Sequence, residues 1–301
     1  MLSLLLTGLS VSRFQVKWET AALSASSKPM TLLAVGTVFG SAVRQHTSSA
    51  PSSSTAMFAF ALPSFVDSLP VLASALGLVQ SCVPQVPANG VWMLTFGASV
   101  PSTGELVRSK HAGVWGVVRS ARTEAGVLGV RCADLGAKKL RMTLERAGAL
   151  REVSEPEVAL RGKLVHSPRL TTASPASPEP KQVDELSSQL ITGGTGGLGL
   201  LTASWLSEAG RHSHVVLVSR SGVLPLADAT RLRSSAAAVV VERCDAAEPA
   251  EMHRLMATMQ CSQPPLRGVW HTAGVLADGL LVTQDARKLH RAFGAKVGGA
   301  V

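Results

Sequence analysis

The 301-residue sequence contains no tyrosine, and aromatic residues make up only 4% of it. Proteins that bind single-stranded nucleic acids stack the bases on aromatic side chains, so this shortage argues against such a function. The formal net charge is +9, but no four lysines or arginines stand in a row. An anionic cofactor and a basic surface therefore explain the charge better than a nucleic acid partner does.

Cysteine is also scarce, and the four residues lie far apart: Cys82, Cys132, Cys244 and Cys261. This spacing favours buried thiols in a reducing compartment. His212 and His214 have no cysteine or carboxylate companion at close spacing, so we predict a solvated loop and no metal. The apolar stretches are too short to span a bilayer. We expect a cytoplasmic protein, with organellar targeting left open.

The composition that is present, 46% hydrophobic and 16% charged residues, is typical of a globular protein with two domains. Residues 171–182 hold three prolines, which disfavour helix and sheet alike, so we predict a boundary there. The first half has α/β character without a phosphate-binding loop. It contains predicted strands at 90–98 and 130–136 and a predicted helix at 111–126.

The second half alternates strands and helices more regularly. We predict strands at 190–192, 214–220, 238–245 and 266–274. We predict helices at 200–210, 226–236 and 250–260. A further helix begins at 285, and the sequence stops soon after it. This alternation predicts an α/β fold with a Rossmann-like, doubly wound parallel sheet, incomplete at its C-terminal end.

A glycine-rich turn joins the first strand of this half to its first helix. The stretch fits GxGxxG at Gly194, Gly196 and Gly199, and it fits TGxxxGxG from Thr192 to Gly199. Glycine permits the unusual backbone angles of such a turn and lets a pyrophosphate approach the main chain. A structural turn without a ligand is the alternative. We predict that a dinucleotide is bound by Thr192, Gly193, Gly194, Thr195, Gly196, Gly197, Leu198 and Gly199.

The helix that follows this turn has apolar residues at helical spacing. We predict that Leu198, Leu201, Trp205 and Ala209 form the stripe that packs on the sheet. The free amide groups at the start of the helix would face the phosphates of the cofactor.

The end of the next strand indicates which dinucleotide is bound. Folds that bind NAD place an acidic residue on the ribose about 20 residues after the glycines. Ser219, Arg220 and Ser221 stand there instead, and a guanidinium pairs with the 2′-phosphate that a carboxylate would repel. We therefore predict NADPH. Cys244 and Asp245 would lie near the adenine, where Asp245 accepts a hydrogen bond from the amino group or caps the next helix.

Five segments of the second half, in order, resemble a known family: TGGTGGLG, LVSRSG, CDAAE, LRGVWHTAGVLADGLL and AKVGGA. They are similar to the ketoreductase domain of modular polyketide synthases and animal-type fatty acid synthases, an extended short-chain dehydrogenase/reductase. Segments 14–19, 113–124 and 157–170 resemble the degenerate Rossmann-like structural subdomain that precedes it. The resemblance implies a structural subdomain at 1–172, a linker at 173–186 and a catalytic subdomain at 187–301.

This resemblance implies NADPH-dependent reduction of a β-ketoacyl thioester to the β-hydroxyacyl form. The acyl chain would be held on the phosphopantetheine of an acyl carrier protein, among neighbouring synthase domains. Lys296 matches the family's catalytic lysine. Leu276 and Asp278 match the LDD signature of the D-configured product, and Ala277 departs from it. The turn beside the nicotinamide ribose would comprise His271, Thr272, Ala273 and Gly274.

The sequence departs from the family pattern where the proton donor should stand. The family's serine and tyrosine follow the lysine motif, whereas this sequence ends five residues past Lys296 and has no tyrosine. We therefore expect a fragment that binds NADPH without appreciable reduction. Two alternatives stay open: a non-reducing NADP(H)-binding or structural module of a synthase, and a basic protein that binds RNA or membranes.

Overall fold

The computed structural model describes residues 14–22, 31–35, 56–60, 68–83, 91–101, 109–126, 129–136, 150, 153–172, 186–208, 214–233 and 237–300. The chain forms two compact units. The first comprises 1–176 and 279–285, and the second comprises 177–278 and 286–301. Residues 279–285 thus pack with the first unit, although the resemblance implies a catalytic subdomain 187–301 that includes them. Apart from residue 186, the predicted linker 173–186 lies outside the described residues, as do Ala209 and His212.

The first unit contains a seven-stranded sheet with the order β1-β7-β6-β5-β4-β3-β2. Strands β2 to β6 are parallel, and the β6–β7 hairpin and β1 add antiparallel pairs. The strands are β1 (Phe14–Ala22), β2 (Thr31–Val35), β3 (Ala56–Phe60), β4 (Val91–Phe96), β5 (Val130–Leu135), β6 (Glu157–Arg161) and β7 (Leu164–Thr172). The predicted strands at 90–98 and 130–136 are confirmed, whereas β2 and β3 were not predicted.

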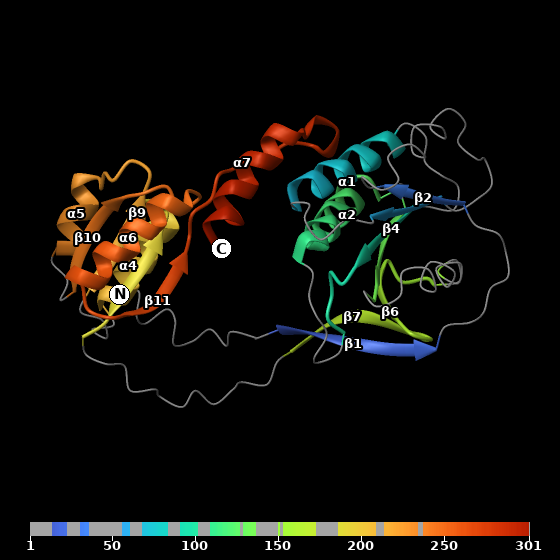
Figure 1. Ribbon diagram of the computed structural model, residues 1–301, viewed down its shortest axis with the longest axis horizontal. Coiled ribbons are helices and arrows are strands. Elements are labelled where there is room, and N and C mark those ends of the chain that lie inside the picture. The colour runs from blue at the N-terminus through green and yellow to red at the C-terminus, as the bar shows by residue number, and fades with distance from the viewer. Residues whose placement is uncertain are drawn as a thin grey trace. The chain divides into compact units, whose positions relative to one another are not determined.

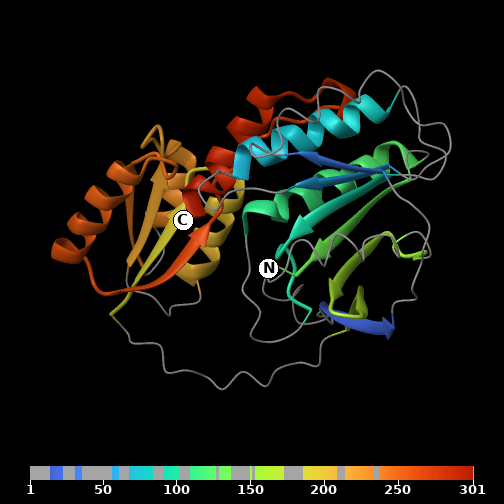
Figure 2. The ribbon, with the colours of Figure 1, turned by 45° about the vertical axis from the view of Figure 1, so that its right-hand side comes forward.

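Two helices of the first unit, α1 (Ser68–Cys82) and α2 (Ala112–Glu124), connect β3 to β4 and β4 to β5. Both connections step in the same direction across the sheet. Right-handed crossovers therefore place both helices on one face, as Figure 2 shows. All six residues of β4 are buried, as expected for a central parallel strand covered on its two faces. The 3-10 helix η2 (Ser109–His111) leads into α2, which confirms the predicted helix.

The second unit contains a four-stranded parallel sheet with the order β10-β9-β8-β11. The connection reverses direction after β10, so α6 lies on the face opposite α4 and α5 (Figure 1). This doubly wound arrangement confirms the predicted fold class. Its elements are β8 (Ser188–Thr192), α4 (Gly197–Glu208), β9 (His214–Ser219), α5 (Leu226–Arg233), β10 (Ala238–Arg243), α6 (Pro249–Ser262), β11 (Leu266–His271), α7 (Ala286–Lys296) and η6 (Gly298–Ala300).

The predicted sheet-facing stripe of α4 is wrong. Leu198, Leu201 and Trp205 are 71%, 60% and 53% exposed. The buried face is formed instead by residues one or two positions away, among them Leu200, Ala203 and Leu206, which pack against β8 and β9. Apolar residues on both faces of the helix also satisfy helical spacing, so the sequence pattern did not identify the buried face.

Two faces of the second sheet carry separate cores. Leu200, Ala203 and Leu206 of α4 meet Leu232 of α5 over one face. Leu255 and Met259 of α6 pack with Leu190 and Val216 on the other. Among the residues that the structure describes, no helix combines the length and the apolar character that a bilayer crossing requires.

Candidate functional site

A cavity of about 800 Å³ opens at the carboxyl ends of the strands in the second unit. The chain order reverses between β8 and β11, and open α/β sheets bind ligands at such a switch point. The volume lies within the range of about 300–1,000 Å³ found for cofactor sites. The lining residues are Gly193, Thr195, Gly196, Val218, Ser219, Arg220, Ser221, Cys244, Asp245, Ala246, Ala247, Thr272, Ala273, Gly274, Val275, His290, Arg291, Gly294 and Ala295.

The glycine-rich turn packs tightly against its surroundings. Gly193 has a φ of +67°, and a Cβ at this position would lie 2.7 Å from the backbone of Ala273. A Cβ on Gly199 would lie 2.5 Å from the carbonyl oxygen of Gly193. These close approaches bring the start of α4 onto the turn, and the first amides of a helix have no intrahelical acceptor. The Gly194 amide already donates to the Val218 carbonyl oxygen and the Gly196 amide to the Gly193 carbonyl oxygen, so donors for an anion would come from the first amides of α4.

The end of β9 supplies one of the two arginines that line the cavity. Arg220 is exposed and lines the cavity between Ser219 and Ser221. The Ser219 hydroxyl oxygen accepts a hydrogen bond from the Gly222 amide at 3.1 Å, which fixes the tight turn after the strand. The guanidinium at this site can pair with a phosphate group in the cavity.

The end of β10 contributes a buried thiol and a carboxylate. Burial raises the pKa of the Cys244 thiol, and the neighbouring Glu251 and Asp245 raise it further. Asp245 accepts a hydrogen bond from the Ala247 amide at 3.0 Å. Helix α6 is capped by Glu248, without a side-chain hydrogen bond. The Asp245 carboxylate thus holds the turn that precedes the helix, and it does not cap the helix itself.

His271 connects the end of β8 to α7. Its Nδ1 lies 2.7 Å from the Thr192 hydroxyl, and its Nε2 lies 3.1 Å from the Ala295 carbonyl oxygen. Because a carbonyl only accepts, Nε2 must donate that bond. Lys296 follows directly, and a Cβ added to Gly274 would lie 3.0 Å from its Nζ. The ammonium of Lys296 therefore lies beside the turn after β11.

The structure gathers much of the predicted cofactor set at one cavity. Of the predicted residues, those that line it are Gly193, Thr195, Gly196, Ser219, Arg220, Ser221, Cys244, Asp245, Thr272, Ala273 and Gly274. Those that do not line it are Thr192, Gly194, Gly197, Leu198, Gly199 and His271. The α7 residues His290 and Arg291 also line the cavity and were missed, because no motif marks them and only the fold brings α7 there.

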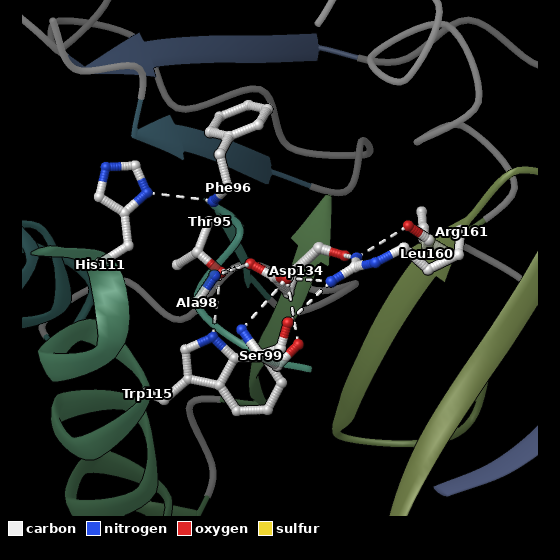
Figure 3. A network of polar contacts seen from close by, with 9 residues as sticks. All are labelled: Thr95, Phe96, Ala98, Ser99, His111, Trp115, Asp134, Leu160 and Arg161. Atoms are coloured by element: carbon white, nitrogen blue, oxygen red, sulfur yellow. Dashed lines mark hydrogen bonds and ion pairs between the residues drawn. The ribbon is translucent and has the colours of Figure 1, made fainter. Parts of the chain in front are cut away.

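The first unit has a different arrangement at the carboxyl ends of β4 and β5 (Figure 3). Asp134 is fully buried and accepts hydrogen bonds from the Ala98 amide at 2.7 Å and the Thr95 hydroxyl at 2.8 Å. Arg161 donates to its second oxygen at 2.8 Å, and Ser99 donates to the same oxygen at 3.1 Å through its hydroxyl. The protein itself thus supplies both the anion and its donors here, from side chains and from the backbone.

Metal chemistry has no candidate in the described part of the chain. No three histidine, cysteine, aspartate or glutamate side chains come together there in a way that could hold an ion. His214, one of the two histidines of the His-x-His, lies at the start of β9 with its Nδ1 buried and unpartnered, so the predicted solvated loop is wrong for His214.

Two family models match the chain. The description "KR domain" matches residues 187–301, and "Polyketide synthase extender module SpnB, Rossmann fold domain" matches residues 16–170. Among similar proteins, chalcone synthase cfoA of Aspergillus candidus is 37% identical over 63% of this chain and 7% of its own length. Polyketide synthase GfsA of Streptomyces halstedii is 35% identical over 76% of this chain and 3% of its own. The chain thus spans less than a tenth of these relatives.

Solved ketoreductase structures share the fold. PlmKR1, the ketoreductase from the first module of phoslactomycin biosynthesis in Streptomyces sp. HK803, is 26% identical with a TM-score of 0.76. The alignment covers 96% of this chain and 68% of that one. The first ketoreductase of the tylosin polyketide synthase is 25% identical with a TM-score of 0.73, over 96% and 68% of the two chains.

Proposed function

Because this chain belongs to the ketoreductase domain family of polyketide synthases, we propose that its cavity binds NADPH for β-ketoreduction. The substrate would be a β-ketoacyl thioester on the phosphopantetheine of an acyl carrier protein. Neighbouring synthase domains would deliver that chain and receive the β-hydroxyacyl product. The cytoplasmic location stays a prediction.

The residues around the cavity fit a phosphorylated dinucleotide. The glycine turn lets the pyrophosphate approach the main chain, and the start of α4 offers backbone donors for it. Arg220 supplies a guanidinium for the 2′-phosphate, and no carboxylate stands at that position to repel it. Bound NADPH would supply the hydride. The single observation that carries this proposal is the presence of Arg220 in the same cavity as Gly193 and Gly196.

Lys296 is the family's catalytic lysine by position. Its ammonium beside Gly274 would stabilise negative charge and lower the pKa of a nearby donor. The 301 residues include no tyrosine, so these residues themselves supply no phenol to protonate the developing alkoxide. We therefore propose that this chain by itself binds NADPH and reduces a β-ketoacyl thioester at no appreciable rate. The absent phenol equally favours a non-reducing NADP(H)-binding module.

A titration of the chain with NADPH and NADH, followed by nucleotide fluorescence, tests the cofactor. We expect wild type to prefer NADPH, and Arg220→Ala to weaken NADPH binding by about tenfold or more, since charge-assisted bonds contribute about 1.5–3 kcal/mol. NADH affinity should stay unchanged. Arg243→Ala is the matched control, because Arg243 is an exposed arginine at the end of β10 that does not line the cavity.

Equal loss of NADH and NADPH affinity in Arg220→Ala would contradict the 2′-phosphate role. Absence of any nucleotide binding by wild type would contradict the whole proposal and favour a structural module. Adding a β-ketoacyl thioester and following NADPH oxidation tests the remaining part. Oxidation at a sustained rate by this chain alone would overturn the predicted inactivity and would require a proton donor other than tyrosine.

A further inference from the structure

The turn formed by residues 279–285 packs with the first unit, while the chain on both sides of it belongs to the second. It contains the 3-10 helix η5 (Leu281–Thr283). The turn is closed by its own backbone bonds, from the Thr283 amide to the Leu280 carbonyl at 2.8 Å and from the Gln284 amide to the Leu281 carbonyl at 3.3 Å. Leu281 is only 5% exposed. A short segment from late in the sequence is thus bound on the first unit.

Two polar side chains of the first unit bind this turn through its backbone. Glu124, the last residue of α2, accepts a hydrogen bond from the Leu281 amide to its Oε2 at 2.6 Å. Gln80 of α1 donates from Nε2 to the carbonyl oxygens of Leu281 and Gln284, both at 2.8 Å. We call Gln80 and Glu124 the turn clamp.

The donors and acceptors of the turn clamp match the turn. The amide nitrogen of Gln80 carries two hydrogens, and one reaches each carbonyl. The Glu124 carboxylate meets a single N–H, which makes a charge-assisted bond. The turn clamp thereby binds both main-chain groups of Leu281: its amide donates to Glu124, and its carbonyl oxygen accepts from Gln80. Buried Leu281 adds an apolar contact, so the turn has one defined place on the first unit.

Both chain segments that flank the turn line the cofactor cavity. Before the turn come Thr272, Ala273, Gly274 and Val275, and after it come His290, Arg291, Gly294 and Ala295. Few residues separate the turn from either segment, namely 276–278 on one side and 286–289 on the other. Releasing the turn would free the chain between β11 and α7, and both lining segments would sample more conformations.

We propose that Gln80 and Glu124 are positioning residues for the cofactor cavity. By binding the turn 279–285 they restrict the two segments that line the cavity on either side of it in sequence. The proposal rests on the proposed function, since it names residues outside the nucleotide-binding unit that raise NADPH affinity. When only a fraction of molecules has the turn bound, the apparent Kd for NADPH rises by the inverse of that fraction.

The test measures NADPH affinity and hydrogen exchange in variants of the full chain. Glu124→Ala removes the acceptor, and Gln80→Glu puts carboxylate oxygens against two carbonyl oxygens. We expect each to weaken NADPH binding by about three- to tenfold and to speed exchange of the Leu281 amide. Glu124→Gln keeps an amide oxygen as acceptor and should restore both quantities most of the way to wild type.

Thr123→Ala and Ser81→Ala are the matched controls. Each changes an exposed residue next to the turn clamp. The Thr123 hydroxyl donates to a carbonyl of its own helix, and the Ser81 hydroxyl does the same and also bonds the Cys82 thiol, so these bonds do not involve the turn and we expect wild-type values. The positioning role would be overturned if Glu124→Ala kept the NADPH affinity of wild type, whether exchange of the Leu281 amide became faster or stayed unchanged. Loss of affinity in Glu124→Gln equal to that in Glu124→Ala would also overturn it. If wild type itself binds no NADPH, the proposed function fails and the positioning role falls with it.

Discussion

The two sheets differ most at the carboxyl ends of their parallel strands. In the first unit, the loop after β4 aims the Ala98 amide at the buried Asp134 carboxylate, which Arg161 also pairs (Figure 3). In the second, the glycine turn after β8 borders a cavity of about 800 Å³. Both edges have room for an anion at the ends of their strands. The first unit fills it with its own anion, whereas the second leaves room for a ligand's phosphates.

This difference shows that a parallel sheet alone does not make a nucleotide site. Whether the strand ends form a nucleotide site depends on the residues found there. In the first unit a buried aspartate lies near the end of β5, and in the second a run of glycines follows β8. The charge pair Arg161–Asp134 makes the first unit's edge a structural element. The comparison therefore predicts that substitutions at the two edges affect different properties, namely folding in one unit and nucleotide binding in the other.

The largest effect should come from removing the first unit's internal anion. Asp134→Ala leaves Arg161, the Ala98 amide and the Thr95 hydroxyl without their shared acceptor. Breaking a buried charge pair in this way costs about 3–5 kcal/mol. We expect that loss in the free energy of unfolding of the first unit, measured by urea denaturation with hydrogen exchange resolving β4 and β5.

Asp134→Asn is the control for size. It keeps one oxygen acceptor in the same volume and should lose distinctly less stability than Asp134→Ala. If Asp134→Ala and wild type had equal free energies of unfolding, the hydrogen bonds and ion pair of Asp134 would contribute nothing to stability. The two sheet edges would then not differ in the way proposed.

The second prediction compares two glycines with similar positive φ. Gly193 has a φ of +67° and Gly162, in the β6–β7 hairpin, one of +63°. A Cβ on Gly193 would lie 2.7 Å from Ala273, whereas one on Gly162 meets nothing within 4 Å. Gly193→Ala should destabilise the second unit by about 2–5 kcal/mol and abolish measurable NADPH binding, because strain and overpacking add.

Gly162→Ala should cost only the backbone strain, about 1–2 kcal/mol, and leave NADPH binding intact. Thermal unfolding and nucleotide titration of both variants measure these effects. If the two substitutions had equal effects, the close packing between the turn and the segment after β11 would not matter.

The smallest expected effect concerns pH and the first unit alone. Burial opposes the ionisation of Glu157, but hydrogen bonds from Arg119 and Arg122 outweigh burial and hold its pKa below the ordinary value of 4.5. A carboxyl with a lowered pKa stabilises the fold fully above that ordinary value, and the contribution disappears as pH falls through the folded pKa. We therefore expect the first unit to lose stability below about pH 4.5.

Glu157→Gln should reduce this acid sensitivity, because the amide does not titrate. Glu155 provides the control: Arg169 lowers its pKa too, but its side chain is 34% exposed, so solvent screens that pair and Glu155→Gln should change the acid profile little. Unfolding curves recorded across the acid range measure both. An unchanged acid profile in Glu157→Gln would assign the sensitivity to other carboxylates.

Local sequence features predicted most elements of the second unit, but in the first unit they predicted only β4, α2 and β5, and helix α1 was missed. The strand at 130–136, the helix at 111–126 and the βαβ alternation of the second half all appear where their apolar patterns and glycine boundaries indicated. Strands β2 and β3 were missed because a five-residue apolar run fits a buried helix segment as well as a strand. The buried face of α4 was assigned wrongly because Leu198 and Leu200 are equally apolar, and only packing on the sheet distinguishes them.

For the candidate site, residue types in motifs were enough to select the glycine turn and Arg220, because their chemistry is local. Contacts between distant segments were not predictable. His290 and Arg291 line the cavity, and Gln80 and Glu124 bind the turn 279–285, although no motif links them. These contacts form between segments far apart in the sequence, and a motif or spacing pattern describes only residues close to one another in the chain.

The sequence by itself therefore determined the fold class, the turn that can hold a dinucleotide, and the absence of tyrosine from these 301 residues. Tertiary structure alone decided which face of α4 is buried and how Asp134 fills the first sheet's edge. It also decided that residues 279–285 join the first unit. The reason is physical: propensity and spacing act over a few residues, whereas hydrogen-bond partners can lie far apart in sequence, by 36 positions for Ala98 and Asp134 and by 201 for Gln80 and Leu281.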